Sequence, residues 1–355
     1  MKVAIIGAGI AGLSCAHELE KFGIMPVIYE RNSYIGEQFS HVAAVLNISH
    51  RPIKDMIKYV EKNYGINITP LNVCDELVHY GPSSTSVIKG KFGYLLERGR
   101  GPGDLKMQLY SQLNRSTVLF NTPGDYNKLS KDYDYVVIAT GNHHFTQELG
   151  CWKYMFKAFA KGGTILANYK PTSVHMYLNR DYCKNGYGYI VPYDNQRAFA
   201  VLVIPNVNEK EVDYYWQTFL NMENINSPIT EEFKLEHSSG LVYPGKLGNI
   251  LFAGNAVGSV DPFLGFGQFY SIATGVWAAR AIAKEKDYEK SLKTLHRRNA
   301  QMNELRLGFD KLGNTGFDLI VKSIALPGVN RMVYGTNINF IKYSAKALKM
   351  IRKIK

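Results

Sequence analysis

The sequence opens with Met1–Glu30, MKVAIIGAGIAGLSCAHELEKFGIMPVIYE, and this stretch decides the fold. The apolar run Lys2–Ile6 predicts a strand, and Leu13–Phe22 predicts a helix. Val27–Tyr29 predicts a second strand, which ends at the acidic Glu30. A strand, a glycine turn, a helix and a strand closed by an acid form the unit that binds a dinucleotide.

The turn of this unit is Gly7-Ala8-Gly9-Ile10-Ala11-Gly12. Gly7 permits a tight turn, Gly9 lets the backbone approach a pyrophosphate, and Gly12 lets helix and strand pack closely. The helix N-terminus then faces the phosphates, and Glu30 is placed to accept both ribose hydroxyls of an adenosine. The predicted cofactor-binding residues of this stretch are Gly7, Gly9, Ile10, Ala11, Gly12, Glu30 and Arg31.

The composition is ordinary for a globular enzyme, since 46% of the 355 residues are hydrophobic and 20% are charged. The net charge of +12 favours anionic partners. The basic residues are spread along the chain without a recognised nucleic-acid-binding module, so no nucleic acid is expected. Four cysteines lie far apart, which predicts reduced thiols in the cytoplasm and no metal site. No apolar run is long enough to predict a spanning helix.

The middle of the chain predicts one central strand and a series of further strands. Residues 32–50 predict a loop that leads away from the first unit. Asp134–Gly141 is a nearly continuous apolar run, typical of a parallel strand buried on both faces, and ligands gather at the carboxyl end of such strands. Four β-rich runs then predict an antiparallel sheet. They cover residues 164–168, 174–178, 187–193 and 199–204.

A second glycine-rich loop follows a short strand, Ile250–Ala253. The strand leads into Gly254-Asn255 and a loop, after which Phe269–Lys284 predicts a helix. A buried strand, a glycine-rich loop and a helix N-terminus form a second anion site. Two such sites so far apart in the sequence suggest one extended ligand held at both ends, and FAD fits this better than NAD.

The rest of the chain predicts helices. In Asn339–Lys355, six basic residues and no acid stand opposite the apolar residues Ile341, Ala345, Leu348 and Ile351. This pattern predicts a basic amphipathic helix and leaves two interpretations open. Either the helix lies on an anionic membrane, as a peripheral contact at its inner face, or it packs on its own protein.

These motifs resemble those of flavoproteins with the p-hydroxybenzoate hydroxylase fold and, within that fold, those of the geranylgeranyl reductases and their relatives. The resemblance covers residues 1–284. Gly7–Gly12 together with Glu30 matches the FAD fingerprint of the fold. Arg98, ahead of Asp104-Leu105, resembles the family's arginine before a helix that starts with aspartate and leucine. The cofactor implied is FAD, with an electron donor left open between NAD(P)H and ferredoxin.

Two further stretches carry the resemblance. Tyr187–Pro192 resembles the stretch that lines the lipid cavity of the reductases, and Gly254–Gly267 resembles the second flavin motif. The resemblance therefore implies further FAD contacts at Arg98, Ala139, Thr140, Gly141, Gly254, Asn255, Asp261, Gly265, Phe266 and Gly267. It implies a substrate pocket lined by Tyr187, Tyr189, Pro192 and Phe266.

The sequence departs from the family pattern at several of these positions. Asn255 replaces the usual aspartate at the ribityl contact, where an amide still forms hydrogen bonds but adds no charge. Ala139-Thr140-Gly141 stands where many hydroxylases have aspartate and glycine, which argues against a nicotinamide-using hydroxylase. Tyr189 replaces tryptophan and Val191 replaces phenylalanine, which changes the expected shape of the pocket.

The order of the motifs predicts an α/β protein with a discontinuous Rossmann-like FAD-binding domain, residues 1–70, 98–150 and 245–285. A mainly antiparallel-sheet substrate domain, residues 71–97 and 151–244, is inserted into it. A helical C-terminal region, residues 286–355, follows.

Three functions remain open on the sequence alone. The first is a reductase that transfers hydride from reduced flavin to a carbon–carbon double bond of a prenyl or other apolar, lipid-like substrate. The second is a flavin monooxygenase or halogenase acting on an aromatic or apolar small molecule. The third is a non-redox lipid cyclase or isomerase, or a flavin-bearing interaction protein. No catalytic acid or base is identified.

Overall fold

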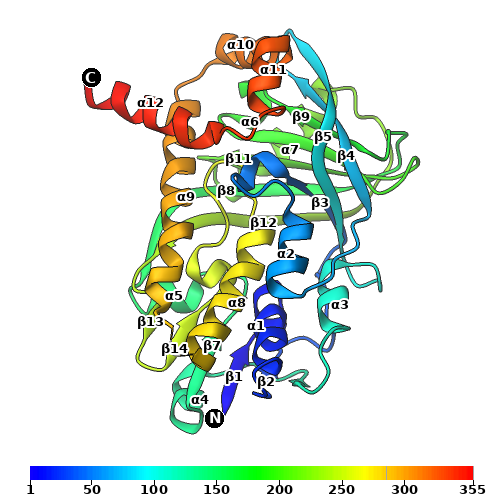
Figure 1. Ribbon diagram of the computed structural model, residues 1–355. Coiled ribbons are helices and arrows are strands. Elements are labelled where there is room, and N and C mark those ends of the chain that lie inside the picture. Colours follow the sequence, from blue (N-terminus) through cyan, green and yellow to red (C-terminus); the bar gives the residue numbers. More distant parts are fainter. Residues whose placement is uncertain (285, 355) are drawn as a thin grey trace.

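The computed structural model describes residues 1–284 and 286–354, and it contains two sheets with helices packed around them (Figure 1). The α/β class expected from the sequence is confirmed, including the helical C-terminus. Residues 285 and 355, which the domain prediction included, lie outside the described part, as does the side chain of Lys353.

The first sheet has six strands and lies at the end of the molecule that holds the N-terminus (Figure 1). Its order is β13 (Lys246–Leu247), β14 (Ile250–Phe252), β7 (Tyr135–Ile138), β1 (Val3–Ile6), β2 (Val27–Tyr29) and β6 (Thr117–Leu119). Every neighbouring pair is parallel except β13 with β14. The prediction of a central parallel strand at 134–141 is confirmed, since β7 is buried between β14 and β1.

The second sheet has eight strands and is mainly antiparallel. Its order is β12 (Ile229–Val242), β8 (Trp152–Ile165), β11 (Ala198–Pro205), β10 (Tyr187–Pro192), β9 (Ser173–Tyr177), β4 (Asn72–Tyr80), β5 (Thr85–Arg98) and β3 (His41–Leu46). The exception is β4 with β9, which pair in parallel. One face packs under helix α7 (Val212–Met222), and the other turns toward the C-terminal helices.

The prediction that residues 32–50 form a loop is wrong for its second half. β3 is an apolar strand that pairs antiparallel with β5, with His41 opposite Arg98. A Cβ atom on Gly93 in β5 would lie 2.0 Å from the carbonyl oxygen of Val45, so the glycine permits this pairing. β3 therefore belongs to the eight-stranded sheet, although the predicted FAD-binding domain included its residues. The pairing brings residues 36–41 next to Arg98.

The helices of the first part are α1 (Ile10–Glu20), α2 (Met56–Tyr64), α3 (Leu105–Tyr110), α4 (Tyr126–Asp132), α5 (His144–Glu148) and α6 (Arg180–Cys183). Short 3₁₀ helices cover Asn47–His50 (η1), Glu209–Glu211 (η2) and Gly254–Val257 (η3). α8 (Gln268–Lys284) packs directly on α1. This packing sets the two glycine motifs against each other.

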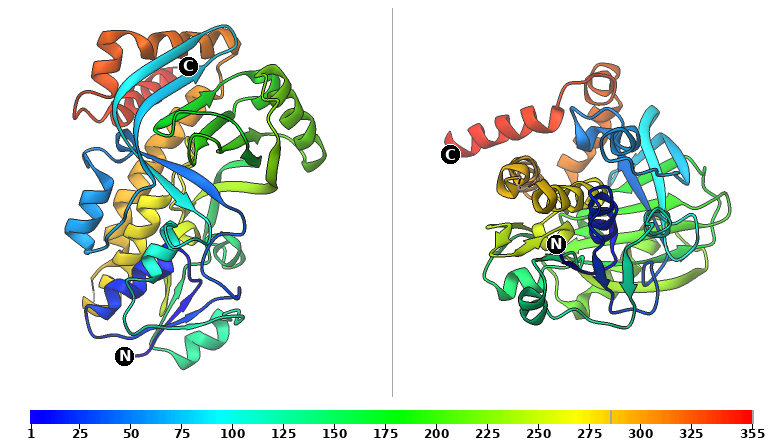
Figure 2. Two further views of the ribbon diagram at one scale, coloured as in Figure 1. Left: turned by 90° about the vertical axis from the view of Figure 1, so that its right-hand side faces the viewer. Right: turned by 60° about the horizontal axis from the view of Figure 1, so that its bottom comes forward.

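The C-terminal helices are α9 (Tyr288–Phe309), α10 (Asn314–Ala325), α11 (Pro327–Val333) and α12 (Phe340–Ile354). α9 runs along the molecule, and α10 and α11 lie at the end opposite the N-terminus (Figures 1 and 2). α12 stands out from the body near that end (Figure 2). Within residues 1–284 and 286–354, no helix has the length and apolar character needed to cross a membrane.

Candidate flavin site

The Gly7–Gly12 turn places the N-terminus of α1 at the carboxyl end of β1. Gly7 has a φ of +104°, and a Cβ atom there would lie 2.6 Å from the carbonyl oxygen of Ala139, at the end of β7. A Cβ atom on Gly12 would lie 2.0 Å from the carbonyl oxygen of Gly7, so no side chain fits between helix and turn. Gly9 is the N-cap of α1 and offers no side-chain cap, which fits a helix N-terminus that binds an anion.

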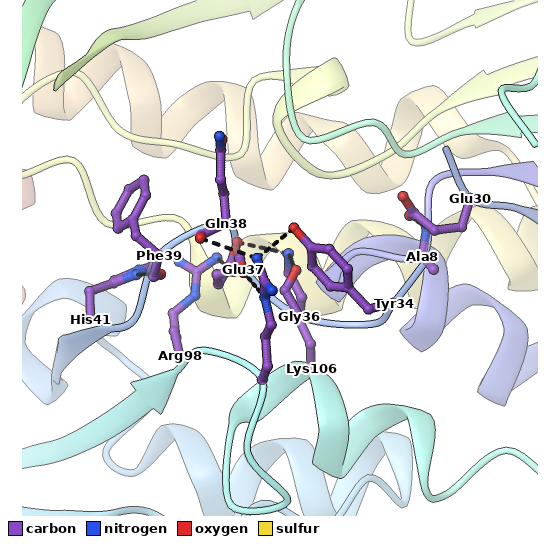
Figure 3. Close-up of polar contacts among 11 residues, drawn as sticks. Ala8, Glu30, Tyr34, Gly36, Glu37, Gln38, Phe39, His41, Arg98 and Lys106 are labelled. Atoms are coloured by element: carbon purple, nitrogen blue, oxygen red, sulfur yellow. Dashed lines mark hydrogen bonds and ion pairs between the residues drawn. The ribbon is translucent and has the colours of Figure 1, made fainter. Parts of the chain in front are cut away.

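Glu30 holds this glycine turn from the end of β2. Its buried carboxylate accepts a hydrogen bond from the backbone N–H of Ala8 at 2.9 Å, and Figure 3 shows the two residues side by side. The backbone N–H of Asn32 donates to the other carboxylate oxygen at 2.8 Å. A carboxylate oxygen accepts two hydrogen bonds, so each keeps room for a ribose hydroxyl. Arg31 is exposed beside it. Direct contact of Glu30 and Arg31 with FAD stays a prediction.

The carboxylate of Glu37 pairs with two basic side chains, Arg98 and Lys106 (Figure 3). Arg98 donates from Nη2 to one carboxylate oxygen of Glu37, and Lys106 donates from Nζ to the other at 2.8 Å. Burial alone raises the pKa of Glu37, but the positive charges of Arg98 and Lys106 outweigh burial and lower that pKa to about 2. The Nε of Arg98 is buried and has no hydrogen-bond partner within the described residues. The predicted flavin residue Arg98 is thus fixed by an acid that sequence analysis did not single out.

This cluster predicts a pH dependence of stability. The pKa of Glu37 falls from 4.5 to about 2 on folding, so its contribution is complete above the unfolded pKa and is lost as the pH falls toward 2. The loss amounts to on the order of 3 kcal/mol. Urea unfolding at a series of pH values measures it. Glu37→Gln removes this titration, so its free energy of unfolding should vary less over that interval than that of the wild type. Parallel curves for the two proteins would contradict the ion cluster.

The second glycine motif lies directly against the first. A Cβ atom on Gly254 would lie 2.9 Å from the Cβ atom of Ala11, and one on Gly275 in α8 would lie 2.2 Å from the Ala11 carbonyl oxygen. The backbone N–H of Gly254 donates to Oγ1 of Thr274 at 2.9 Å. The Oδ1 of Asn255 is buried without a hydrogen-bond partner in the part of the chain described here. A buried oxygen of this kind fits a ligand that supplies a donor.

The side chain of Asp261 holds the loop between η3 and α8 through hydrogen bonds to its backbone. Its fully buried carboxylate accepts hydrogen bonds from the backbone N–H groups of Phe263 at 2.9 Å, Leu264 at 2.7 Å and Phe266 at 3.1 Å. Arg298 of α9 donates to the same carboxylate at 3.2 Å. These contacts fold the loop that carries Gly265, Phe266 and Gly267 in front of α8. The structure therefore gives Asp261 a role in holding the loop, and its direct contact with FAD stays a prediction.

Tyr187 of β10 is hydrogen-bonded to the same loop. Its hydroxyl donates to the carbonyl oxygen of Leu264 at 2.7 Å. A Cβ atom on Gly265 would lie 3.1 Å from this hydroxyl and 3.3 Å from Nε2 of His237 on β12. The predicted substrate residue Tyr187 thus joins the eight-stranded sheet to the predicted flavin loop.

The other predicted pocket residues divide between the two faces of the sheet. Tyr189 and Phe266 pack on the same apolar cluster as Tyr187, and the rings of the two tyrosines lie 6.2 Å apart. Side chains alternate along a strand, so Pro192 points to the opposite face from Tyr189. It pairs with Ala198, which belongs to the cluster under α7. Pro192 therefore does not share the face of Tyr187 and Tyr189, and its place in a substrate pocket stays a prediction.

A matched pair of tyrosine variants tests the link between sheet and loop. Tyr187→Phe removes the hydrogen bond to Leu264 and should lower the free energy of unfolding by about 1 kcal/mol, with weaker flavin binding. Tyr189→Phe is the control, since its hydroxyl donates to no group within the described residues, and it should bind flavin as the wild type does. Fluorescence titration of the flavin-free apoprotein with FAD measures the flavin affinity of both variants. Equal affinities in the two variants would show that the Tyr187 contact does not hold the loop.

Two buried arginines of α9 were missed by sequence analysis. Arg298 holds Asp261, and Arg306 is 2% exposed, with its guanidinium 4.8 Å from the ring centre of Phe309. Both occupy core positions of the helix, in register with Leu295 and Met302. The signal that could have found them is an arginine at a helical spacing otherwise filled by apolar residues.

A cavity of about 410 Å³ lies outside this site. It is lined by residues at the start of β7 and the end of α8, among them Tyr135 and Ile282. The glycine motifs lie at the opposite ends of these elements, at the carboxyl end of β7 and the N-terminus of α8. The cavity therefore plays no part in the candidate site.

The two-sheet fold and the paired glycine motifs define an FAD-dependent oxidoreductase fold. In agreement, residues 2–80 match the family model described as FAD dependent oxidoreductase. FAD is the cofactor of this fold, and Gly7, Gly12, Asn255 and the uncapped α1 N-terminus fit it. When bound, FAD is therefore expected to lie along the contact between the two motifs.

Solved structures share this fold over nearly the whole chain. A geranylgeranyl bacteriochlorophyll reductase-like protein from Thermoplasma acidophilum is 16% identical, with a TM-score of 0.75 and 98% of each chain covered. The flavin-dependent halogenase CmlS is 16% identical, with a TM-score of 0.66, over 99% of this chain and 77% of its own. The flavin-dependent brominase Bmp2 is 13% identical, with a TM-score of 0.66 and 100% of each chain covered. These similarities confirm the fold expected from the motifs.

Proposed function

We propose that this protein reduces carbon–carbon double bonds of an apolar, prenyl-type substrate. The observation that supports this most is the apolar face of the eight-stranded sheet beside the 261–267 loop. Three aromatic rings stack there, from β11, from β12 and from the loop before β3, with ring centres 5.6 Å apart for Phe199 and Phe233 and 4.1 Å apart for Phe39 and Phe233. Burying a charged group against such a surface would be unfavourable, whereas the isoprenoid chain of a substrate matches it.

The histidines of this face carry no charge near neutral pH. Desolvation and the positive charge of Arg98 lower the pKa of His41 to about 3. Desolvation also lowers the pKa of His237, which lies beside Gly265. Both imidazoles are therefore neutral, and the side of the sheet that meets the loop remains suited to an apolar substrate.

The protein's contribution is to bind and orient the cofactor and the substrate and to exclude water from the site. FAD, when bound, supplies the two-electron chemistry. The Gly7–Gly12 turn and the N-terminus of α1 would hold its phosphates, and Asn255 would offer its free oxygen to a donor group. The N-terminus of α8 favours negative charge next to the 265–267 loop. Aromatic packing around Tyr187 and Phe266 would keep water from the reacting centre.

The likeness to a geranylgeranyl bacteriochlorophyll reductase-like protein supports a prenyl substrate, but a halogenase and a brominase share the fold. Oxygen dependence distinguishes the two chemistries. The holoenzyme is reduced with dithionite under nitrogen, which makes the test independent of the natural electron donor. Geranylgeranyl diphosphate is then added, with its fully saturated analogue as control.

If the protein is a reductase, the absorbance of oxidised flavin should return without oxygen, in step with the loss of double bonds measured by mass spectrometry. The saturated analogue should leave the flavin reduced. If the flavin stays reduced with both compounds and no double bond is lost, the reductase proposal is wrong. An oxygenated or halogenated product that forms only after air is admitted would favour an oxygen-dependent enzyme.

A further inference from the structure

Three of the four apolar residues that the sequence places along one side of the C-terminal helix already pack within the protein, whereas the fourth, Ile351, is 55% exposed. Ile341 and Ala345 are buried at 8% and 3% exposure. The Leu348 side chain lies 3.0 Å from the Cβ position of Gly308 in α9. Arg352 is tied to Glu304 of α9 at 2.6 Å. The side of α12 formed by these residues therefore packs on α9, as the second of the two sequence interpretations expects.

The outer side of α12 is different and has no partner within the described residues. At 100° per residue, Tyr343 and Met350 point away from the packed side, and they are 58% and 54% exposed. Lys342, Lys346 and Lys349 are all exposed and follow one flank of these two residues. An exposed tyrosine and methionine beside a row of lysines make an outer side that is both apolar and basic.

The surroundings of α12 have a strong charge bias. Between residues 311 and 352 there is one acid, Asp318, and its carboxylate accepts hydrogen bonds from Ser83 and Ser84. The bases of the same stretch are Lys311, Lys322, Arg331, Lys342, Lys346, Lys349 and Arg352. Leu326 and Ile338, at the same end of the molecule, are also 56% and 46% exposed. This end of the molecule is thus electropositive and carries exposed apolar side chains.

We infer that the outer side of α12 docks the protein onto an anionic lipid bilayer. Lysine stems reach headgroup phosphates while tyrosine and methionine enter the interfacial region, which is how a basic interfacial helix binds. α12 stands out from the body at the end away from the flavin site, where a flat surface can approach it (Figures 1 and 2). The inference stands apart from the proposed reaction, because it depends only on charge and exposure.

Vesicle flotation of the full-length holoenzyme tests this inference. Vesicles of phosphatidylcholine with one third phosphatidylglycerol should bind the wild type, and vesicles of phosphatidylcholine alone should not. Lys342→Gln/Lys346→Gln/Lys349→Gln should bind the anionic vesicles at least about 30-fold more weakly, because each lysine near an anionic surface adds several-fold to the affinity. Tyr343→Ser/Met350→Ser should weaken binding about 10-fold even at low salt.

The matched control removes the same charge from the opposite end of the molecule. Lys2, Lys128 and Lys131 are exposed near the N-terminus and α4, and Lys2→Gln/Lys128→Gln/Lys131→Gln should bind within about threefold of the wild type. Flavin absorbance shows that every variant is folded. Unchanged binding of the α12 lysine variant, or an equal loss in the control, overturns the inference. Self-association that Tyr343→Ser/Met350→Ser abolishes would instead assign this side of the helix to a second copy of the chain.

Discussion

Replacing Gly9 by valine is expected to yield a folded protein without flavin. Gly9 has a φ of −87°, which any residue adopts, and a Cβ atom there would meet only the Ala139 carbonyl oxygen, at 3.7 Å. The protein itself therefore tolerates a side chain at this position. The same side chain would fill the space that a pyrophosphate needs in front of α1, and FAD affinity should fall on the order of 100-fold or more. The visible absorbance of the purified protein and a titration with FAD measure the loss.

The control for this experiment is Gly328→Val in α11. Gly328 is exposed, and a Cβ atom there would meet no atom within 4 Å, so this variant should purify with full flavin content. Circular dichroism should show both variants folded. A Gly9→Val protein as yellow as the wild type would mean that no phosphate lies at this turn.

The largest loss of stability is expected for Asp261→Ala. The substitution removes the acceptor of three loop N–H groups and leaves Arg298, whose side chain is 8% exposed, without its counter-charge. Removing one partner of a buried ion pair costs about 3–5 kcal/mol, because the other charge stays buried. Urea unfolding should show this decrease, together with weaker flavin binding, because the 263–267 loop loses its support. Asp261→Asn retains one acceptor oxygen and should fall between the alanine variant and the wild type.

An exposed acid provides the comparison. Glu209 lies 3.7 Å from Lys234 with its side chain 69% exposed, so Glu209→Ala should change the free energy of unfolding by no more than about 0.5 kcal/mol. A loss in Asp261→Ala as small as this would show that the loop does not depend on the buried pair.

The parts of the site that were predictable from the sequence are local in the chain. Gly7, Gly12 and Glu30 lie within one strand, turn, helix and strand, and their geometry follows from backbone sterics that a short motif specifies. The buried strand at 135–138 was predictable for a similar reason, since a strand covered on both faces must be apolar throughout.

The parts that were missed depend on contacts between distant segments. The sequence predicts a loop at β3 although HVAAVL is an apolar run, because the partner strand, β5, lies about fifty residues further along. Glu37 gave no signal by itself, because Arg98 and Lys106 give it its role only after the sheet has formed. For the C-terminal helix, periodicity identified one apolar side, Ile341 and Leu348, but periodicity does not say what such a side packs on.

The packing of α8 on α1 has a consequence for the biosynthesis of this protein. Ala11 meets Gly254 and Gly275, so a nascent chain displays only half of the cofactor-binding surface until α8 has left the ribosome. Flavin capture must then come late, after most of the chain has been translated. Under riboflavin starvation, full-length apoprotein should therefore accumulate and be degraded by proteases, because no bound flavin stabilises the contact between the two glycine motifs.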